Sequence, residues 1–441
     1  MEKAMEKMKV AWICHFSNQE VRNKLPLSKM RISNFLRTIL GKAKFKYGDF
    51  APWVNNLIKE FEKFEDVELH IIAPHAGLKR KRFDFEMNGI HYHFFKSEND
   101  NIYTLIINKL DLNKKPKYTK NRKQINEIVA AIKPDIVNLI GAENIYYSIS
   151  VLDIENIPIY VSLQTIANNP RLKQFGIGSD FEREIEFKIH QKEKYFGCTG
   201  RLYHDLLLNN NPNAIIFKMF FPIQHPPKIE KNIRKEFDFV FYAARVVKNK
   251  GIEDTLDALA LVKKEKPSVK LNVIGYCPKK YKQFLLKRIK ALDLKDNVVF
   301  HDYFPLHKDM FKQVLKSKFA VVPGITAIIN GTVIEPILLG LPVVTYKTSG
   351  TPYLNREKEC VLLAEIGDIE GLANNMLKLI NDENYAQMLA QNANEFVTRT
   401  FDNTTSTKRL LEDYKAVIAH FHNGTPIPEE LLFDLNEFPK Y

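Results

Sequence analysis

The stretch from Val321 to Gly350 constrains the fold more than any other part of the chain. An apolar strand, Phe319 to Val322, runs into the small-residue loop Pro323-Gly324. A short helix is predicted from about Asn330 to Glu335, and a second apolar strand, Leu341 to Val344, follows at once. So compact a strand–loop–helix–strand unit places a helix N-terminus at the carboxyl edge of a parallel sheet. Such an edge favours phosphate, because unpaired backbone N–H groups and the helix dipole both attract anions.

Strand and helix patterns alternate along the rest of the chain, which predicts an α/β fold in two halves. In the first half, strands are predicted at Lys9–Cys14, Val67–Ile72, Lys133–Leu139 and Ile159–Leu163, with helices at Ala51–Phe64 and Ile125–Ile132. His91–Phe95 alternates between polar and apolar residues and is predicted to be an edge strand. In the second half, strands are predicted at Phe237–Tyr242, Val269–Gly275 and Asn297–Phe300, with helices at Ile252–Lys264 and Asn403–Phe421. The proline-rich stretch Phe221–Pro227 breaks all periodicity and is the predicted linker.

Length and composition fit an enzyme of two or three domains. The chain has 441 residues, of which 45% are hydrophobic and 27% charged, as is ordinary for a globular protein. Its four cysteines lack the spacing of a disulfide framework or a zinc site. The sequence has no run of about 18 apolar residues and no apolar leader at its start. We therefore expect a cytoplasmic protein.

The net charge of +13 is concentrated in one segment. Residues 21–48 contain eight cations and no acid, interleaved with apolar residues spaced as on one helical face. Lysines near an anionic bilayer contribute about 1 kcal/mol each, so this segment could dock reversibly on the inner face of a membrane. A core-packed helix with a solvated basic rim explains the pattern equally well. Nucleic-acid binding is the weakest explanation, because few aromatic residues are available for base stacking, and no nucleic-acid partner is predicted.

Two cations stand where a diphosphate would need them. Arg245 and Lys250-Gly251 follow the predicted strand at Phe237–Tyr242 and precede the next helix. Both side chains could reach the space over the strand end, where each charged hydrogen bond to phosphate contributes about 1.5–3 kcal/mol. Alternatively, Arg245 and Lys250 are surface cations at the start of a helix and bind no phosphate.

Glu335 has two explanations. Thr332-Val333-Ile334-Glu335 spells a capping box, in which the glutamate reaches back to cap its own helix. A carboxylate in that first turn could equally accept hydrogen bonds from sugar hydroxyls beside the phosphates. The two roles can coexist.

The Arg245 and Lys250 pair, Glu335 and the strand beginning Gly340-Leu341-Pro342 together resemble the donor-sugar segment of glycosyltransferase family 4. The resemblance covers about Phe237 to Val397 and, in the first half, the layout only. It implies a GT-B fold: two Rossmann-like parallel-sheet domains facing a central cleft, with a C-terminal helix crossing back to the first domain. On this basis residues 1–223 form the acceptor-binding domain and 228–402 the nucleotide-sugar domain, while 403–441 form a crossing helix and tail on the first domain.

The resemblance also implies roles for individual residues. Arg245 and Lys250 would bind the diphosphate and Glu335 the nucleotide ribose. The remaining donor contacts would come from Gly275, Asn330, Gly331, Thr332 and Val333, and acceptor contacts from His15, Gln164 and Arg201. The family usually carries two glutamates eight positions apart; Glu335 corresponds to the second, but Ala327 stands at the position of the first. Gln164 stands where relatives often have a histidine, and it cannot act as a general base.

By this resemblance the protein is a retaining, metal-independent glycosyltransferase of bacterial polysaccharide or lipopolysaccharide synthesis. It would need no cofactor beyond its nucleotide-sugar donor and would act on a glycan or lipid-linked acceptor. The loss of a carboxylate at Ala327 leaves a second hypothesis open, a catalytically impaired GT-B protein that binds nucleotide or glycan as a partner. His91 and His93 could hold a metal, but the sequence offers no third ligand, so no metal site is predicted.

Overall fold

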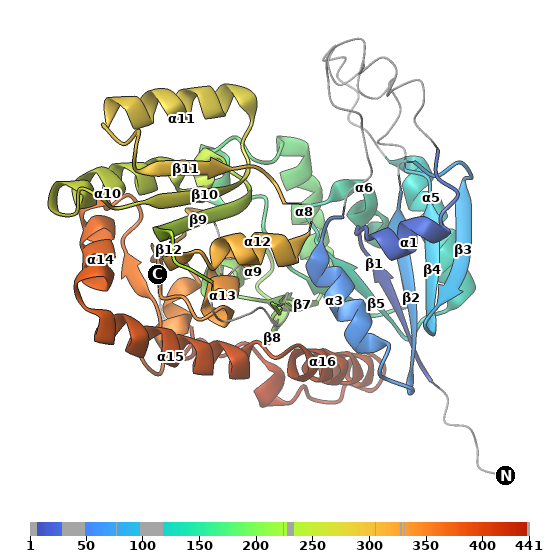
Figure 1. Cartoon of the computed structure of the whole chain (residues 1–441). Coiled ribbons are helices and arrows are strands. Elements are labelled where there is room, and N and C mark those ends of the chain that lie inside the picture. Colours follow the sequence, from blue (N-terminus) through green and yellow to red (C-terminus); the bar gives the residue numbers. More distant parts are fainter. Residues whose placement is uncertain are drawn as a thin grey trace. The chain divides into compact units, whose positions relative to one another are not determined.

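The computed structural model describes residues 7–28, 49–75, 77–97, 118–223, 225–226, 233–304, 306–326, 329 and 331–438. The chain divides into two compact units (Figure 1). Unit 1 comprises Met1–Cys198, Tyr203–Pro222 and Asn403–Phe433. Unit 2 comprises Thr199–Leu202, Ile223–Asp402 and Asp434–Tyr441. Each unit is built around one sheet.

Unit 1 contains an eight-stranded sheet in the order β3-β4-β2-β1-β5-β6-β7-β8. All neighbouring strands are parallel except β3 and β4, which pair antiparallel. The strands are β1 Met8–Ile13, β2 Val67–Pro74, β3 Arg82–Met87, β4 Ile90–Phe95, β5 Ile136–Ile140, β6 Ile159–Ser162, β7 Tyr195–Cys198 and β8 Ile215–Lys218. The helices between them are α1 Gln19–Lys24, α3 Pro52–Phe61, α5 Thr119–Ile132, α6 Ile145–Ser148, α7 Pro170–Gln174, α8 Asp180–Lys192 and α9 Arg201–Asn210.

The last long helix, α16 (Asn403–Asn423), belongs to unit 1 although it follows all of unit 2 in sequence. It lies against α3 (Figure 1). Leu410, Leu411, Tyr414 and Val417 of α16 join α1, α3 and one face of the sheet in a single apolar core. The Tyr414 hydroxyl accepts a hydrogen bond from Asn138 of β5 at 2.6 Å, and Tyr160 of β6 donates to Asp413 at 3.0 Å. The predicted return of the final helix to the first domain is therefore confirmed.

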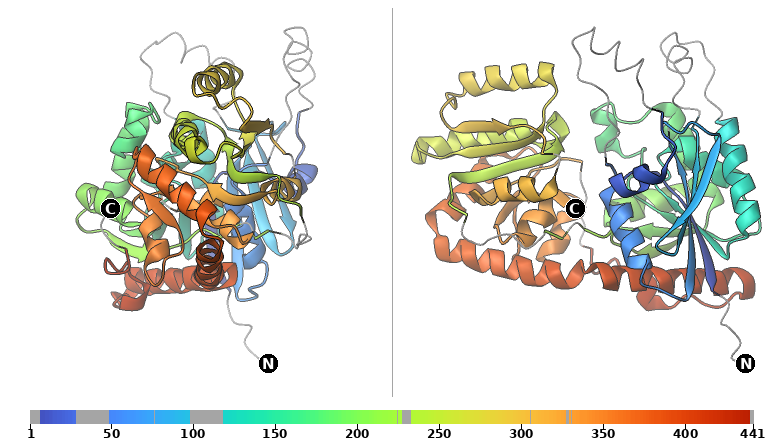
Figure 2. Two further views of the ribbon diagram at one scale, coloured as in Figure 1. Left: turned by 60° about the vertical axis from the view of Figure 1, so that its left-hand side comes forward. Right: turned by 45° about the vertical axis from the view of Figure 1, so that its right-hand side comes forward.

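Unit 2 contains a six-stranded, all-parallel sheet in the order β11-β10-β9-β12-β13-β14. Its strands are β9 Phe237–Arg245, β10 Leu271–Tyr276, β11 Val298–His301, β12 Ser317–Val321, β13 Val343–Tyr346 and β14 Leu362–Ala364. Its helices are α10 Ile252–Glu265, α11 Lys279–Ala291, α12 His307–Val314, α13 Gly331–Leu338, α14 Ile369–Asn381 and α15 Glu383–Thr400. One apolar core joins α10, α11 and α14 to the sheet, and Figure 2 shows these helices lying along it.

The strand at His91–Phe95 is not the edge strand that the sequence predicted. β3 pairs with β4 and covers it, so β3 is the edge. A two-residue turn joins them, in which Asn88 and Gly89 have φ of 53° and 74°. Asn-Gly between alternating strands is the strongest short-range hairpin signal, so the sequence did contain this information.

Three further expectations concern the basic segment, membrane spanning and the C-terminal tail. Of the basic segment 21–48, only residues 21–28 lie within the described part of the chain. Within the described parts of the chain, none of the helices combines the length and apolar character needed to cross a bilayer. The tail from Asp434 groups with unit 2, whereas the sequence placed it on the first domain.

Candidate functional site

Glu335 lies in the middle of the short helix that the sequence predicted. This helix, α13, begins at Gly331, so Thr332 is inside its first turn and is not the N-cap residue of a capping box. The Glu335 carboxylate instead accepts a hydrogen bond from the Tyr242 hydroxyl of β9 at 3.0 Å. Burial raises the pKa of Glu335 to about 7, although the hydrogen bond from Tyr242 opposes that shift. The carboxyl group is thus held at the carboxyl edge of the sheet and titrates near neutral pH.

The two predicted cations reach this edge from β9. Arg245 is the exposed last residue of that strand, and Lys250 ends the one-turn 3₁₀ helix Lys248–Lys250 that follows it. Burial lowers the pKa of Lys250. The backbone N–H of Ile325, in the loop before α13, donates to the Asn249 carbonyl at 3.1 Å. That bond ties the Lys250 turn to the loop leading into the helix.

Gly251 makes this close approach possible. Its φ is +84°, and a Cβ atom there would lie 2.0 Å from the Pro323 carbonyl oxygen. Gly275, at the end of β10, is similar, since a Cβ atom would lie 1.9 Å from the Ala243 carbonyl oxygen. The sequence assigned Gly275 to donor binding, but in the structure its visible role is to let two strand ends approach each other.

The predicted donor residues Gly331, Thr332 and Val333 are the first three residues of α13, at the end of the helix whose dipole favours anions. Gly331 leaves room for Glu335, whose Oε1 atom would lie 2.9 Å from a Cβ atom at that position. Asn330 and Ala327 fall outside the described residues. Unit 2 therefore gathers Arg245, Lys250, Glu335 and the α13 N-terminus at one sheet edge.

A second polar cluster lies at the carboxyl edge of the unit 1 sheet. His15 follows β1, and its Nδ1 atom contacts the Tyr146 hydroxyl. Burial lowers the pKa of His15 to about 4, with His75 adding to the shift, so the ring is neutral at pH 7. Gln164 follows β6. In the amide orientation that satisfies both neighbours, it donates to Glu143 at 3.3 Å and accepts from Trp53 Nε1 at 3.2 Å.

Sequence analysis missed Glu143. This residue follows β5 at the same edge, and burial raises its pKa to about 7. Its Oε2 atom is buried and has no hydrogen-bond partner among the described residues. The available signal was its position directly after an apolar strand, in the loop Gly141-Ala142-Glu143.

Arg201 groups with unit 2, whereas the other predicted acceptor residues, His15 and Gln164, belong to unit 1. It is the first residue of α9. Its guanidinium donates to the Phe438 carbonyl at 3.4 Å. The Phe438 ring stacks on Tyr353 at 4.5 Å, so Arg201 helps hold the C-terminal tail.

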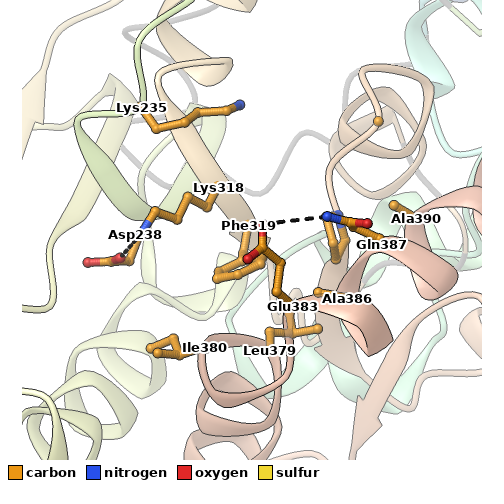
Figure 3. Close-up of a pocket in the computed structure, with 12 residues that line it drawn as sticks. Lys235, Asp238, Lys318, Phe319, Leu379, Ile380, Glu383, Ala386, Gln387 and Ala390 are labelled. Atoms are coloured by element: carbon orange, nitrogen blue, oxygen red, sulfur yellow. Dashed lines mark hydrogen bonds and ion pairs between the residues drawn. The ribbon is translucent and has the colours of Figure 1, made fainter.

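One pocket in unit 2 lies away from these groups. It has a volume of about 430 Å³ and is lined by Lys235, Asp238 and Lys318, together with residues of α14 and α15 (Figure 3). Lys318 pairs with Asp238 at 3.1 Å, and Lys235 donates to the carbonyls of Leu315 and Ser317. These residues stand at the amino ends of β9 and β12, opposite the edge that holds Glu335. Ligands of open parallel sheets bind at the carboxyl edge.

Comparison with known proteins finds a family match within unit 2 and its linker. Residues 226–396 match the family described as glycosyl transferases group 1. The chain is 23% identical over 282 residues to the capsular polysaccharide biosynthesis glycosyltransferase CapM of Staphylococcus aureus. That match covers 60% of this chain and 64% of CapM. The N-acetyl-alpha-D-glucosaminyl L-malate synthase of Bacillus anthracis is 21% identical over 275 residues, covering 60% of this chain and 70% of that protein.

Solved structures match nearly the whole chain. Sucrose-phosphate synthase from Thermosynechococcus elongatus superposes with a TM-score of 0.68 at 13% identity, covering 94% of this chain and all of that one (100%). HepE of Anabaena, in complex with UDP and glucose, gives a TM-score of 0.61 at 15% identity, covering 92% of this chain and 99% of that one. The chain as a whole thus has the GT-B fold, and its residues 226–396 are similar to the glycosyl transferases group 1 family.

Proposed function

We propose that this protein is a retaining glycosyltransferase that moves a sugar from a nucleoside-diphosphate donor to a glycan or lipid-linked acceptor in cell-surface polysaccharide synthesis. The observation that carries the proposal is the group of Arg245, Lys250, Glu335 and the α13 N-terminus at one sheet edge of a group 1 domain. The name of CapM, a capsular polysaccharide enzyme, supports the acceptor class.

The donor would lie with its diphosphate against Arg245, Lys250 and the first N–H groups of α13. Two fixed cations and a helix N-terminus offset the charge that develops on the leaving diphosphate, which is catalysis by preorganised electrostatics. Glu335 would accept hydrogen bonds from the ribose hydroxyls. The base is proposed to be uracil, because HepE was solved with UDP and the E. coli trehalose-6-phosphate neighbour with UDP-2-fluoro glucose.

No protein nucleophile is needed in this mechanism. The acceptor hydroxyl attacks the anomeric carbon on the face from which the diphosphate departs, and its proton passes to a leaving phosphate oxygen. The protein contributes position and fixed charge. With Arg245 and Lys250 supplying the positive charge, transfer is proposed to proceed without a metal ion.

The acceptor would meet the unit 1 cluster of His15, Glu143 and Gln164. Neutral His15 and the Gln164 amide can hydrogen-bond sugar hydroxyls. Glu143 adds a carboxyl group whose buried Oε2 atom has no hydrogen-bond partner among the described residues. Such a group can accept a hydrogen bond from an acceptor hydroxyl.

Ala327 supports a second candidate, a GT-B protein that binds nucleotide or glycan with impaired turnover. The two candidates share nucleotide binding and differ in catalysis. Slow hydrolysis of a UDP-sugar, detected as released UDP over hours, would favour the enzyme. Saturable binding without any release would favour the non-enzymatic partner.

The donor site is tested by calorimetric titration of UDP into the purified protein. Arg245→Ala and Lys250→Ala should each weaken UDP binding by about 10- to 150-fold, as expected for a lost charged hydrogen bond of 1.5–3 kcal/mol. Lys248→Ala is the matched control, because Lys248 is an exposed cation in the same 3₁₀ turn. Equal UDP affinity in all three variants would rule out the proposed diphosphate site.

A further inference from the structure

Three histidines lie together on one face of the unit 1 sheet, away from the carboxyl edge. β2 and β4 pair in parallel with His70 directly opposite His91, and His93 is two residues further along β4. The alternate residues Leu69 and Ile71 enter the core shared with α3 and α16. Because side chains alternate along a strand, Glu68 and His70 point to the opposite face of the sheet.

The histidine and carboxylate atoms on this face form a continuous chain of contacts. His70 Nε2 lies 2.9 Å from Glu68 Oε1, and His70 Nδ1 lies 3.0 Å from His93 Nε2. His93 Nδ1 in turn lies 2.9 Å from Asp84 Oδ1 on β3. The His91 ring stacks on His70 with 4.7 Å between centroids.

The tautomers of His70 and His93 decide which ring nitrogen is left bare to bind a ligand. The contacts Glu68–His70, His70–His93 and His93–Asp84 each join two groups that must share a hydrogen. A neutral imidazole carries one N–H, so two neutral rings supply two hydrogens for three contacts. With His70 donating from Nδ1 and His93 from Nδ1, the bare His70 Nε2 faces a carboxylate oxygen. In the other arrangement His70 donates to Glu68 and the bare nitrogen is His93 Nδ1, where Arg82 supplies a cation: its Nη2 atom lies 3.5 Å from that nitrogen and its Nε donates to Asp84 Oδ1 at 2.8 Å.

In the first arrangement the bare Nε2 atom of His70 can bind a metal ion beside the Glu68 carboxylate. His70 is buried, with 7% of the residue exposed, whereas Glu68 and His91 are partly exposed. Donor atoms of Glu68, His70 and His91 all lie within 4.8 Å of one another. Small side-chain rotations would bring them to the separation of roughly 3.3 Å that a tetrahedral zinc ion requires.

We propose that Glu68, His70 and His91 bind a divalent transition-metal ion, with zinc as the best match, and that His93 and Asp84 hold His70 in the ligating tautomer. Two imidazoles and one carboxylate are borderline ligands, suited to zinc and poorly suited to magnesium or calcium. The chain His70–His93–Asp84 corresponds to the carboxylate–histidine partners that orient metal-bound imidazoles elsewhere. A metal here would join β2 to β4 and stabilise unit 1.

The test is titration of the full-length, untagged protein with ZnCl₂ by calorimetry and with CoCl₂ by visible absorption. We expect one zinc per chain, a rise in melting temperature on zinc addition, and a cobalt ligand-field band. His91→Gln should weaken zinc binding at least tenfold and abolish the band. His422→Gln, an exposed histidine of α16, is the matched control and should change neither.

His93→Gln separates a positioning residue from a ligand. It should weaken zinc binding by about 10- to 100-fold, yet keep a cobalt band at saturating metal, since all three ligands remain. If His91→Gln fails to fold, Glu68→Gln tests the site instead, because Glu68 is partly exposed. The proposal is overturned if the wild-type protein takes up no zinc, or if the ligand variants bind it as tightly as wild type does.

Discussion

Glu335 shows how one residue's surroundings set its chemistry. Tyr242 donates to its Oε2 atom, and Gly331 leaves space for Oε1. Burial disfavours the charged form, so the carboxyl group is about half ionised at neutral pH. Only the ionised form offers both oxygens as acceptors to a ribose. Donor binding should therefore depend on pH even though the pyrophosphate of a UDP-sugar carries constant charge.

The affinity for UDP-glucose should rise about tenfold between pH 6 and pH 8 if binding requires the ionised carboxylate. The folded pKa of about 7 lies inside that window, so raising the pH ionises the group and strengthens binding. Calorimetric titration across this range checks the prediction. Glu335→Gln should bind more weakly, with a flatter profile, whereas a profile as steep as the wild type's would assign the dependence to another group.

Sequence patterns identify site residues that follow a strand at a fixed spacing. Arg245, Lys250 and Glu335 could be predicted as site residues for that reason. Glu143 and His70 could not, because their importance comes from neighbours in other strands. Glu143 meets Gln164 across the carboxyl edge, and His70 meets His91 only through the β2–β4 register. Side-chain contacts between strands depend on register, which local periodicity does not reveal.

At the scale of elements, direct contacts hold the turn from Lys248 to Gly251 against the loop before α13. The tight approach of Gly251 to Pro323 and the Ile325–Asn249 bond fix both at once. The position of Lys250 therefore depends on a glycine that touches no ligand.

Gly251→Ala should destabilise unit 2 by roughly 2–4 kcal/mol, because the new methyl group meets a carbonyl oxygen and the backbone has positive φ. Gly367→Ala is the control. Its φ is +85°, but no atom lies within 4 Å of a Cβ there, so it should cost only about 1–2 kcal/mol. Urea unfolding followed by circular dichroism measures both. Equal losses would mean that backbone strain, and not the contact with Pro323, dominates.

The sequence predicted which segments form parallel strands and long helices more accurately than it predicted the residues at which they begin and end. Buried parallel strands are continuous apolar runs, as in β9 and β10, and such runs are easily recognised. The mistake at β4 came from reading polar alternation as solvent exposure. Histidines at alternate positions there face β2 and β3 partners, so polarity on that face reflects a polar cluster.

On the scale of the whole molecule, each unit has its own apolar core. Two-state unfolding is not expected of such a chain. Both tryptophans, Trp12 and Trp53, lie in unit 1, so tryptophan fluorescence reports that unit, whereas circular dichroism reports both.

Tyr414→Ala should lower the stability of unit 1 by about 3–5 kcal/mol, since it leaves a cavity and removes the acceptor of the buried Asn138 amide. The fluorescence midpoint in urea should fall. Leu372→Ala, in the unit 2 core, should leave fluorescence unchanged and shift only the dichroism transition. Identical shifts of both probes in both variants would show that the units unfold together.

The basic segment 21–48 remains a proposed docking surface for anionic membranes. Its eight cations predict that the protein pellets with phosphatidylglycerol vesicles at low salt and is released as salt screens the attraction. Phosphatidylcholine vesicles are the neutral control. Equal recovery by both kinds of vesicle would leave the core-packed helix as the explanation.

The position of α16 in the chain has a consequence during synthesis. Roughly 180 residues of unit 2 are translated between the two main parts of unit 1. At about 5–20 residues per second, the sheet surface that α16 covers waits roughly 10–40 s after Pro222 is made before its partner leaves the ribosome. The sheet of unit 2 can form by then, before the core of unit 1 is closed by α16. This chain would therefore most need a chaperone while the rest of unit 1 has been translated but α16 has not.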